Sequence, residues 1–147
     1  MVPDEKRSER LQQFLAARGG LRLFVLTAVS PMLSLQSRYL LIQREGGGTL
    51  LTCDDCGLHA PFEEGREDAV APEPMAAFLE QMAIVGVETL DDYRPANIHD
   101  GVTVIVEYAD HDTYHRLRII DPPPGSLHAR VLAAWASAFP QVRRALR

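Results

Sequence analysis

Apolar and polar residues alternate most regularly between residues 102 and 120. Two runs with the two-residue period of a β-strand, 102–108 and 113–120, flank the polar stretch 110–112. This arrangement predicts a β-hairpin with a short loop. The region is the clearest structural signal in the chain, and it also carries a dense group of chemically capable side chains.

The register of this hairpin follows from its apolar pattern. Pairing Ala109 with Asp112 gives one nearly all-apolar face, and a slip by one residue would destroy that face. His115 is then expected on the core side, as a hydrogen-bonded core or rim residue. Glu107 is expected opposite Tyr114 on a solvated face.

Shorter runs predict the remaining strands. Residues 21–27 (LRLFVLT) form an apolar strand that ends at Ser30-Pro31. Residues 38–44 and 49–53 form a second hairpin around the turn Glu45-Gly46-Gly47-Gly48, where glycine permits positive φ angles. Residues 54–73 contain many acids, glycines and prolines without periodicity, and they are predicted to be a loop.

Three segments have helical patterns. The first covers Asp4 to Arg18 and has no apolar face in its first half, so residues 1–20 are predicted to be a peripheral element that packs through its last turns. The second begins near Pro74 and carries the stripe Met75, Phe78, Leu79 and Met82. The third is capped by Ser126, ends at Pro140 before a basic tail, and faces inward with Leu127, Val131, Trp135 and Ala138.

This order of elements predicts an α+β fold, with an antiparallel sheet of about five strands covered on one face by two or three helices. A length of 147 residues fits a single domain over residues 1–147. The apolar stretch 21–33 contains Arg22 and is too short to span a bilayer, so a buried strand is preferred to a signal peptide. With two cysteines, a cytoplasmic location without membrane attachment is expected.

Charge divides the chain into three parts. Residues 1–53 carry four acids and seven bases, residues 54–112 carry fifteen acids and two bases, and residues 113–147 carry one acid and six bases. The chain as a whole has no excess of basic residues, which a non-specific nucleic-acid-binding protein would be expected to have. The acidic middle segment either steers a basic partner to the protein or keeps the protein in solution.

Cysteine and histidine spacings suggest one metal site. Cys53 and Cys56 form a C-x-x-C, and His111 and His115 form an H-x3-H, which together resemble the ligand order of a zinc site. His59 is a possible substitute for one histidine. A thioredoxin-like role is disfavoured because two aspartates lie between the thiols. Zinc in this alternative interpretation is the one cofactor considered.

Known catalytic motifs are absent from the sequence, which has no G-x-S-x-G, no H-E-x-x-H and no phosphate-binding glycine loop. Enzymatic activity is therefore not favoured. The candidate binding residues are acids and one histidine that lie in two polar segments or in the adjoining strand, namely Asp54, Asp55, Glu107, Asp110, His111 and Asp112.

The motif Asp100-Gly101-x5-Glu107 followed by Tyr114-His115-Arg116 resembles the C-terminal half of a group of small bacterial α+β proteins that have no assigned activity. The resemblance covers about residues 98–124. Val104 replaces the tryptophan usual in that group, and the turn is Asp-His-Asp instead of glycine-rich. The resemblance implies the hairpin and carries no function.

Three interpretations of the function follow as expectations. The first is a non-enzymatic binding protein that recognises a basic protein through its acidic surface, for example a bacterial immunity protein or an inhibitor of a basic toxin or nuclease. The alternative is a small-molecule or metal-binding domain, with an enzymatic role left open. An accessory domain that oligomerises through an uncovered sheet face is a third interpretation.

Overall fold

The computed structural model describes residues 4–30, 35–57, 60–96 and 102–146. The chain forms one six-stranded sheet in the order β4-β3-β2-β1-β5-β6, and each neighbouring pair is antiparallel. The strands are β1 (Arg22–Ser30), β2 (Leu35–Arg44), β3 (Gly47–Gly57), β4 (Arg66–Val70), β5 (Thr103–Ala109) and β6 (Tyr114–Ile120).

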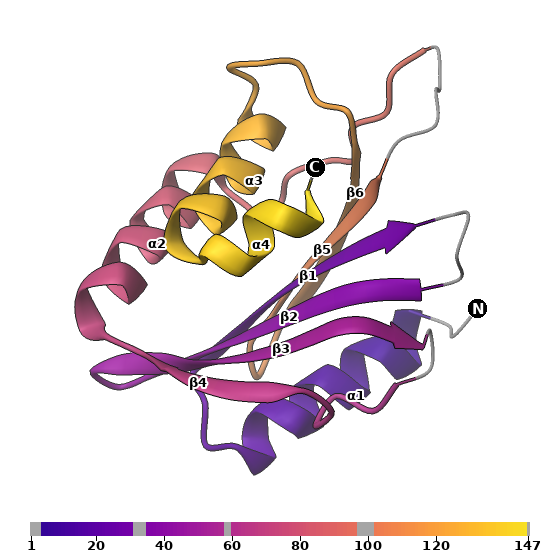
Figure 1. Cartoon of the computed structure of the whole chain (residues 1–147). Helices are drawn as coiled ribbons and strands as arrows, with labels where there is room; N and C mark the ends of the chain where they lie inside the picture. Colours follow the sequence, from indigo (N-terminus) through magenta and orange to yellow (C-terminus); the bar gives the residue numbers. More distant parts are fainter. Residues whose placement is uncertain (1–3, 31–34, 58–59, 97–101, 147) are drawn as a thin grey trace.

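Helices cover both faces of the sheet. They are α1 (Asp4–Ala17), α2 (Pro72–Val85), α3 (Leu127–Ala138) and α4 (Pro140–Ala145). The last three lie together on one face, and α1 lies on the opposite face (Figure 1). The predicted α+β fold with an antiparallel sheet is confirmed, with six strands instead of about five, but the helices cover both faces of the sheet instead of the one face predicted. No helix among the described residues is long and apolar enough to cross a membrane.

Each face of the sheet has its own apolar core, because alternate strand residues point to opposite faces. In the larger core, under α2, α3 and α4, the ring of Phe78 lies 5.0 Å from Trp135 and 5.2 Å from Phe24 between centroids, both edge to face. The smaller core lies under α1, whose residues Leu11 and Leu15 are completely buried. Helix α1 thus packs its apolar residues through its second half, as the pattern indicated.

Local sequence signals set most element boundaries. The β2–β3 hairpin turns at Glu45-Gly46, where Gly46 has a φ of 75°. Helix α2 ends at Gly86 in the left-handed conformation. Helix α3 begins after Ser126, whose side chain accepts a hydrogen bond from the backbone N–H of Ala129 at 3.1 Å. The boundaries predicted for the turn between β2 and β3 and for the start of α3 are confirmed to within a few residues.

Two elements were not predicted. Strand β4 lies within the segment predicted to be a loop, and its residues are exposed apart from the half-buried Val70. Helix α4 occupies the predicted basic tail, since Pro140 ends α3 and also begins the next helix, which buries Val142. Leu127, predicted to face inward, is 47 % exposed. Strand β4 and helix α4 were missed because both lack the apolar periodicity on which sequence-based prediction depends.

The register of the β5–β6 hairpin differs from the prediction by two residues. Ala109 pairs with Tyr114 instead of Asp112, and Val106 pairs with Leu117. The longer loop arises because the side chain of Asp110 accepts hydrogen bonds from the backbone N–H groups of Asp112 at 2.8 Å and Thr113 at 2.7 Å. A shift of two residues preserves the faces, so the core face is as predicted.

Candidate functional site

Glu107 is not on a solvated face, and this part of the prediction is wrong. Its side chain is 2 % exposed and lies beneath α1. The guanidinium of Arg7 donates to both of its carboxylate oxygens, at 2.8 and 2.7 Å, and the hydroxyl of Tyr114 donates to it at 2.7 Å. Burial, together with the Glu107 carboxylate, raises the pKa of Tyr114. Glu107 therefore anchors α1 to the sheet and is withdrawn from any binding surface.

The tip of the hairpin contains the next three candidates. Asp110 is engaged in the turn and also accepts a hydrogen bond from the hydroxyl of Tyr108 at 2.8 Å. His111 is exposed, and its Nε2 lies 3.1 Å from the carbonyl oxygen of Gly20. Asp112 is exposed. The side chains of His111 and Asp112 are thus exposed at the tip, while Asp110 holds the loop.

The hydrogen bonds around Asp110 predict a pH-dependent contribution to stability. Burial raises its pKa, but hydrogen bonds from Asp112, Tyr108 and Thr113 outweigh this effect and hold the pKa at about 2. An unfolded aspartate titrates near pH ~4. The contribution is therefore complete above about pH 4 and is lost as the pH falls toward about 2. Urea unfolding of wild type and Asp110→Asn should show a stability gap that narrows in this window; a constant gap would contradict the prediction.

His115 lies on the face covered by α2 and α3, and its Nε2 is 2.7 Å from the carbonyl oxygen of Leu90. The two histidines of the predicted zinc site therefore have separate partners. The cysteines lie in β3, which is separated from β5 by the two strands β2 and β1, and His115 lies in β6, beyond β5. The cysteines also lie toward the other end of the sheet. Ala109, next to the hairpin tip, is aligned across the strands with Leu23, Ile42 and Thr49, and both cysteines come further along β3 than Thr49. The structure does not bring the four predicted ligands together.

Cys53 and Cys56 lie at the end of β3 and form a disulfide. Both cysteines are buried, whereas Asp54 and Asp55 between them are exposed. Asp55 has a φ of 49°, so the backbone turns tightly between the two sulfurs. His59, the predicted substitute ligand, lies outside the described residues.

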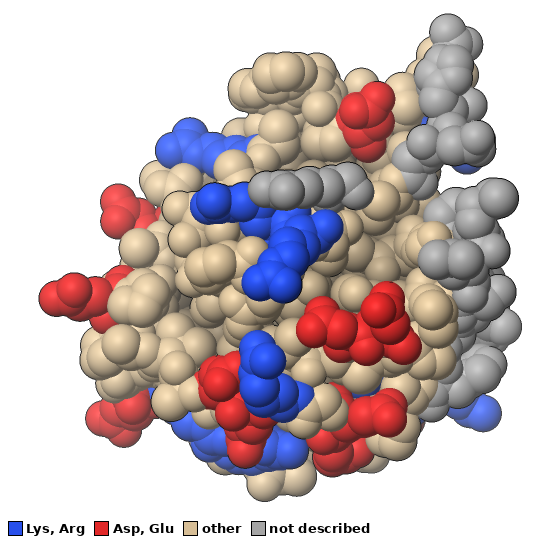
Figure 2. Space-filling view, in the orientation of Figure 1, with Lys and Arg blue, Asp and Glu red and all other residues tan. Residues whose placement is uncertain are grey.

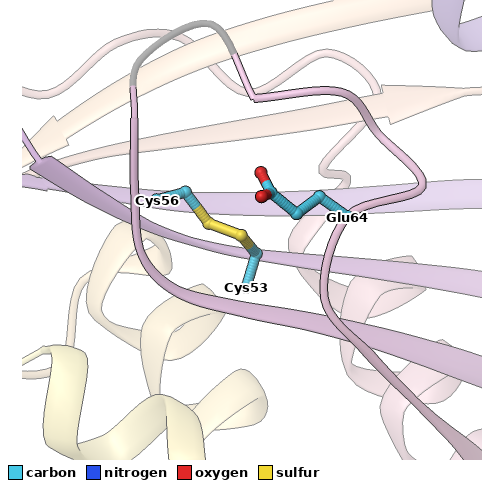
Figure 3. Close-up of side chains that lie close together, drawn as sticks. All are labelled: Cys53, Cys56 and Glu64. Atoms are coloured by element: carbon cyan, nitrogen blue, oxygen red, sulfur yellow. A yellow bond between two sulfur atoms is a disulfide. The ribbon is translucent and has the colours of Figure 1, made fainter.

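The side chain of Glu64 lies next to the two cysteines. Its carboxylate points toward the sulfurs (Figure 3), and the two sulfurs and a carboxylate oxygen all lie within 4.8 Å of one another. Among the described residues this is the one group of three or more His, Cys, Asp or Glu side chains with such spacing. Glu64 was missed from the sequence because no spacing rule connects it to the C-x-x-C motif.

Arg38 organises the loop that carries Glu64. The side chain is 2 % exposed, and its guanidinium donates to the carbonyl oxygens of Ala60 at 2.9 Å and Pro61 at 2.5 Å. It also lies 5.5 Å from the ring centroid of Phe62. Burial and the nearby charge of Arg7 lower the pKa of Arg38. The sequence contained one signal of this arrangement, namely that the charged residue Arg38 lies within a strand.

A groove of about 490 Å³ lies between α1 and the loop before β4. Its lining includes Arg10, Arg18, Phe62 and Glu63. The guanidinium carbons of Arg7 and Arg10 each lie 4.8 Å from the Phe62 ring centroid. Phe62 is 5 % exposed, so it serves mainly to join the loop to α1.

Exposed acids concentrate along the β3–β4 side of the sheet. We call this surface the acidic edge; it consists of Asp54, Asp55, Glu63, Glu64, Glu67 and Asp68. Arg18 pairs with Glu67 at 2.6 Å, and Arg66 pairs with Asp68 at 2.9 Å. Figure 2 shows acidic groups on the lower part of this view with basic groups among them, and a further basic group above. The predicted residues Asp54 and Asp55 thus belong to a larger surface than the sequence indicated.

Strand β4 borders the acidic edge and is an edge strand of the sheet, hydrogen-bonded to β3 on one side. At the opposite edge, Tyr93 covers part of β6: its N–H donates to the carbonyl of Arg118 at 2.9 Å, and its carbonyl accepts from the N–H of Ile120 at 3.0 Å. No described segment covers the outer side of β4 in the same way.

Neither a known protein-family model nor a curated protein matches this chain.

Proposed function

We propose that this protein binds an extended, basic segment of a partner protein along the acidic edge and β4. The observation that supports the proposal is the coincidence of an edge strand that no described segment covers with a group of six exposed acids. An edge strand presents unpaired backbone N–H and C=O groups to which an extended peptide can add. Lysine and arginine side chains of such a peptide complement the acids.

The charges of β4 favour a foreign strand over self-association. Strand β4 carries two acids, Glu67 and Asp68, beside one arginine, Arg66, so pairing of two β4 strands would bring like carboxylates close together, which is destabilising. Asp54, Asp55 and Glu63 add further negative charge at the surface. A basic toxin or nuclease neutralised by this protein is the kind of partner that the arrangement fits.

The probe for this function is a synthetic peptide that alternates lysine and valine, with a glutamate–valine peptide as its counterpart. Binding of the lysine peptide is expected to weaken as salt is added. Neutralising Asp54, Asp55 and Glu63 together removes three exposed charges of the acidic edge, worth about 0.5 kcal/mol each, and leaves the Arg18–Glu67 and Arg66–Asp68 ion pairs intact. Affinity measured by calorimetry should therefore fall about tenfold.

The matched control neutralises Glu45, Glu80 and Glu88, which are exposed acids outside the acidic edge. It changes the net charge equally and should leave affinity unchanged. A peptide methylated on alternate backbone nitrogens tests strand addition, since it retains its charges but loses donors. Equal effects of both triple variants, or undiminished binding of the methylated peptide, would contradict the proposal.

A further inference from the structure

We infer that Cys53, Cys56 and Glu64 form a binding site for a thiophilic divalent cation of the zinc class once their disulfide is reduced. This ligand set differs from the one suggested by the sequence, because it excludes His111 and His115 and includes a carboxylate. The inference does not rest on the proposed peptide binding, although Glu64 also belongs to the acidic edge, because Co²⁺ binding is measured without any peptide.

The spacing of the three side chains suits tetrahedral coordination. Zinc lies about 2.3 Å from thiolate sulfur and about 2.0–2.2 Å from carboxylate oxygen. In a tetrahedron these bonds place ligand atoms about 3.5–3.8 Å apart. Here the three ligand atoms are within 4.8 Å of one another in the oxidised protein. Reduction lets the sulfurs separate to this distance, and the Glu64 carboxylate already points toward them (Figure 3).

The surrounding backbone holds these ligands in place. Strand β3 carries both cysteines, and the tight turn at Asp55 directs them to the same site. Arg38 fixes the carbonyls of Ala60 and Pro61 in the segment that leads to Glu64. The three ligands therefore come from two short segments that are attached to the same β2–β3 strand pair.

Arg38 also balances the charge of the occupied site. Two thiolates and one carboxylate carry three negative charges, so a divalent cation leaves one. Arg38 is the cross-strand partner of Cys53, and its positive charge interacts with Glu64. Its Nε atom is buried without a hydrogen-bond partner among the described residues. A buried guanidinium without full hydrogen bonding is stabilised by a nearby anionic centre.

The chemistry requires a reductant, here a water-soluble phosphine. The phosphine donates two electrons to the disulfide and becomes a phosphine oxide, taking its oxygen from water; the two protons of that water give two thiols. Cation binding then displaces both thiol protons. With three protein ligands, the fourth position of the cation is left to water. In a reducing compartment the dithiol form would be the one available for metal.

The test uses the full chain, reduced with the phosphine, desalted without oxygen and titrated with Co²⁺. Thiolate coordination gives an intense sulfur-to-cobalt absorption band in the near ultraviolet, which Zn²⁺ then abolishes. We expect this band in the reduced protein and not in the oxidised one. Glu64→Gln should weaken Co²⁺ binding by at least about tenfold, since even outer-shell partners of metal ligands contribute on that scale.

Glu63→Gln is the matched control, because Glu63 is an equally charged, exposed neighbour outside the ligand set. His111→Ala tests the ligand set suggested by the sequence, and both controls should titrate like wild type. The inference would be overturned by a reduced wild-type protein without the band, by Glu64→Gln binding Co²⁺ as tightly as wild type, or by loss of the band in His111→Ala.

Discussion

Replacing Glu107 with alanine is expected to lower the free energy of unfolding by about 3–5 kcal/mol. The substitution leaves the Arg7 guanidinium and the Tyr114 hydroxyl without their shared acceptor beneath α1. An uncompensated charge in a half-buried position has lost its hydration without gaining a partner. Urea unfolding followed by circular dichroism measures the effect.

A double-mutant cycle separates this effect from a simple loss of packing. Arg7→Ala removes the other partner, so the double variant should be much less destabilised than the sum of the two single variants. Asp112→Ala, an exposed acid near the same hairpin, should change stability by no more than about 0.5 kcal/mol. Additive single effects would show that Glu107 and Arg7 do not act as a pair.

Trp135→Ala is expected to cost about 3–5 kcal/mol, as large-to-small substitutions of buried aromatic residues do. Trp135 is completely buried in the larger core and contacts Phe78 and Phe139, with ring centroids 5.0 and 5.8 Å away. The cavity would lie where α2, α3 and α4 meet, so all three helices lose contacts. Since Trp135 is the single tryptophan, unfolding must be followed by far-ultraviolet circular dichroism.

Two variants make this second prediction specific. Trp135→Phe keeps an aromatic ring and should cost much less, because the indole N–H has no hydrogen-bond partner among the described residues to lose. Leu127→Ala changes the same helix at a position that is 47 % exposed and should stay within about 0.5 kcal/mol. A loss in Leu127→Ala comparable with that in Trp135→Ala would contradict the assignment of the core.

The elements that could be predicted are those that bury an apolar face. The stripe through Met75, Phe78 and Met82 predicted α2, and all three side chains are buried as expected. The alternation in residues 102–120 likewise predicted β5 and β6. Strand β4 could not be predicted because its side chains are almost all exposed. It is held by backbone hydrogen bonds to β3, and these do not require a pattern of apolar side chains.

The face of the sheet covered by α1 shows a second reason why sequence-based prediction was incomplete. Glu107 stands among apolar residues in β5, and its charge suggested solvent. In the structure this charge is matched by Arg7, which is separated from it by 100 residues along the chain. Local patterns cannot identify such a partner, because either residue alone is typical of an exposed surface. The layer formed by α1 was therefore incompletely predicted.

The candidate site was predicted in part for the same reason. The C-x-x-C motif drew attention to Cys53 and Cys56, and the structure places both at one site. Glu64 reaches them through the loop that Arg38 holds, which is a tertiary arrangement. The histidines had suitable spacing in the sequence, but the strand order places them elsewhere. Spacing identifies ligands within one segment, whereas topology decides which segments meet.

The order of the strands also has a consequence for synthesis on the ribosome. Strands β1 to β4 are consecutive neighbours, so they can pair as they emerge. The other side of β1 remains without its neighbour until β5, Thr103–Ala109, has been made. During that interval β1, six of whose nine residues are buried in the folded protein, is an open edge of the nascent chain, a state prone to mispairing. Once β5 has been made, it pairs with the open side of β1. Its residue Glu107 then supplies the carboxylate that binds Arg7 of α1.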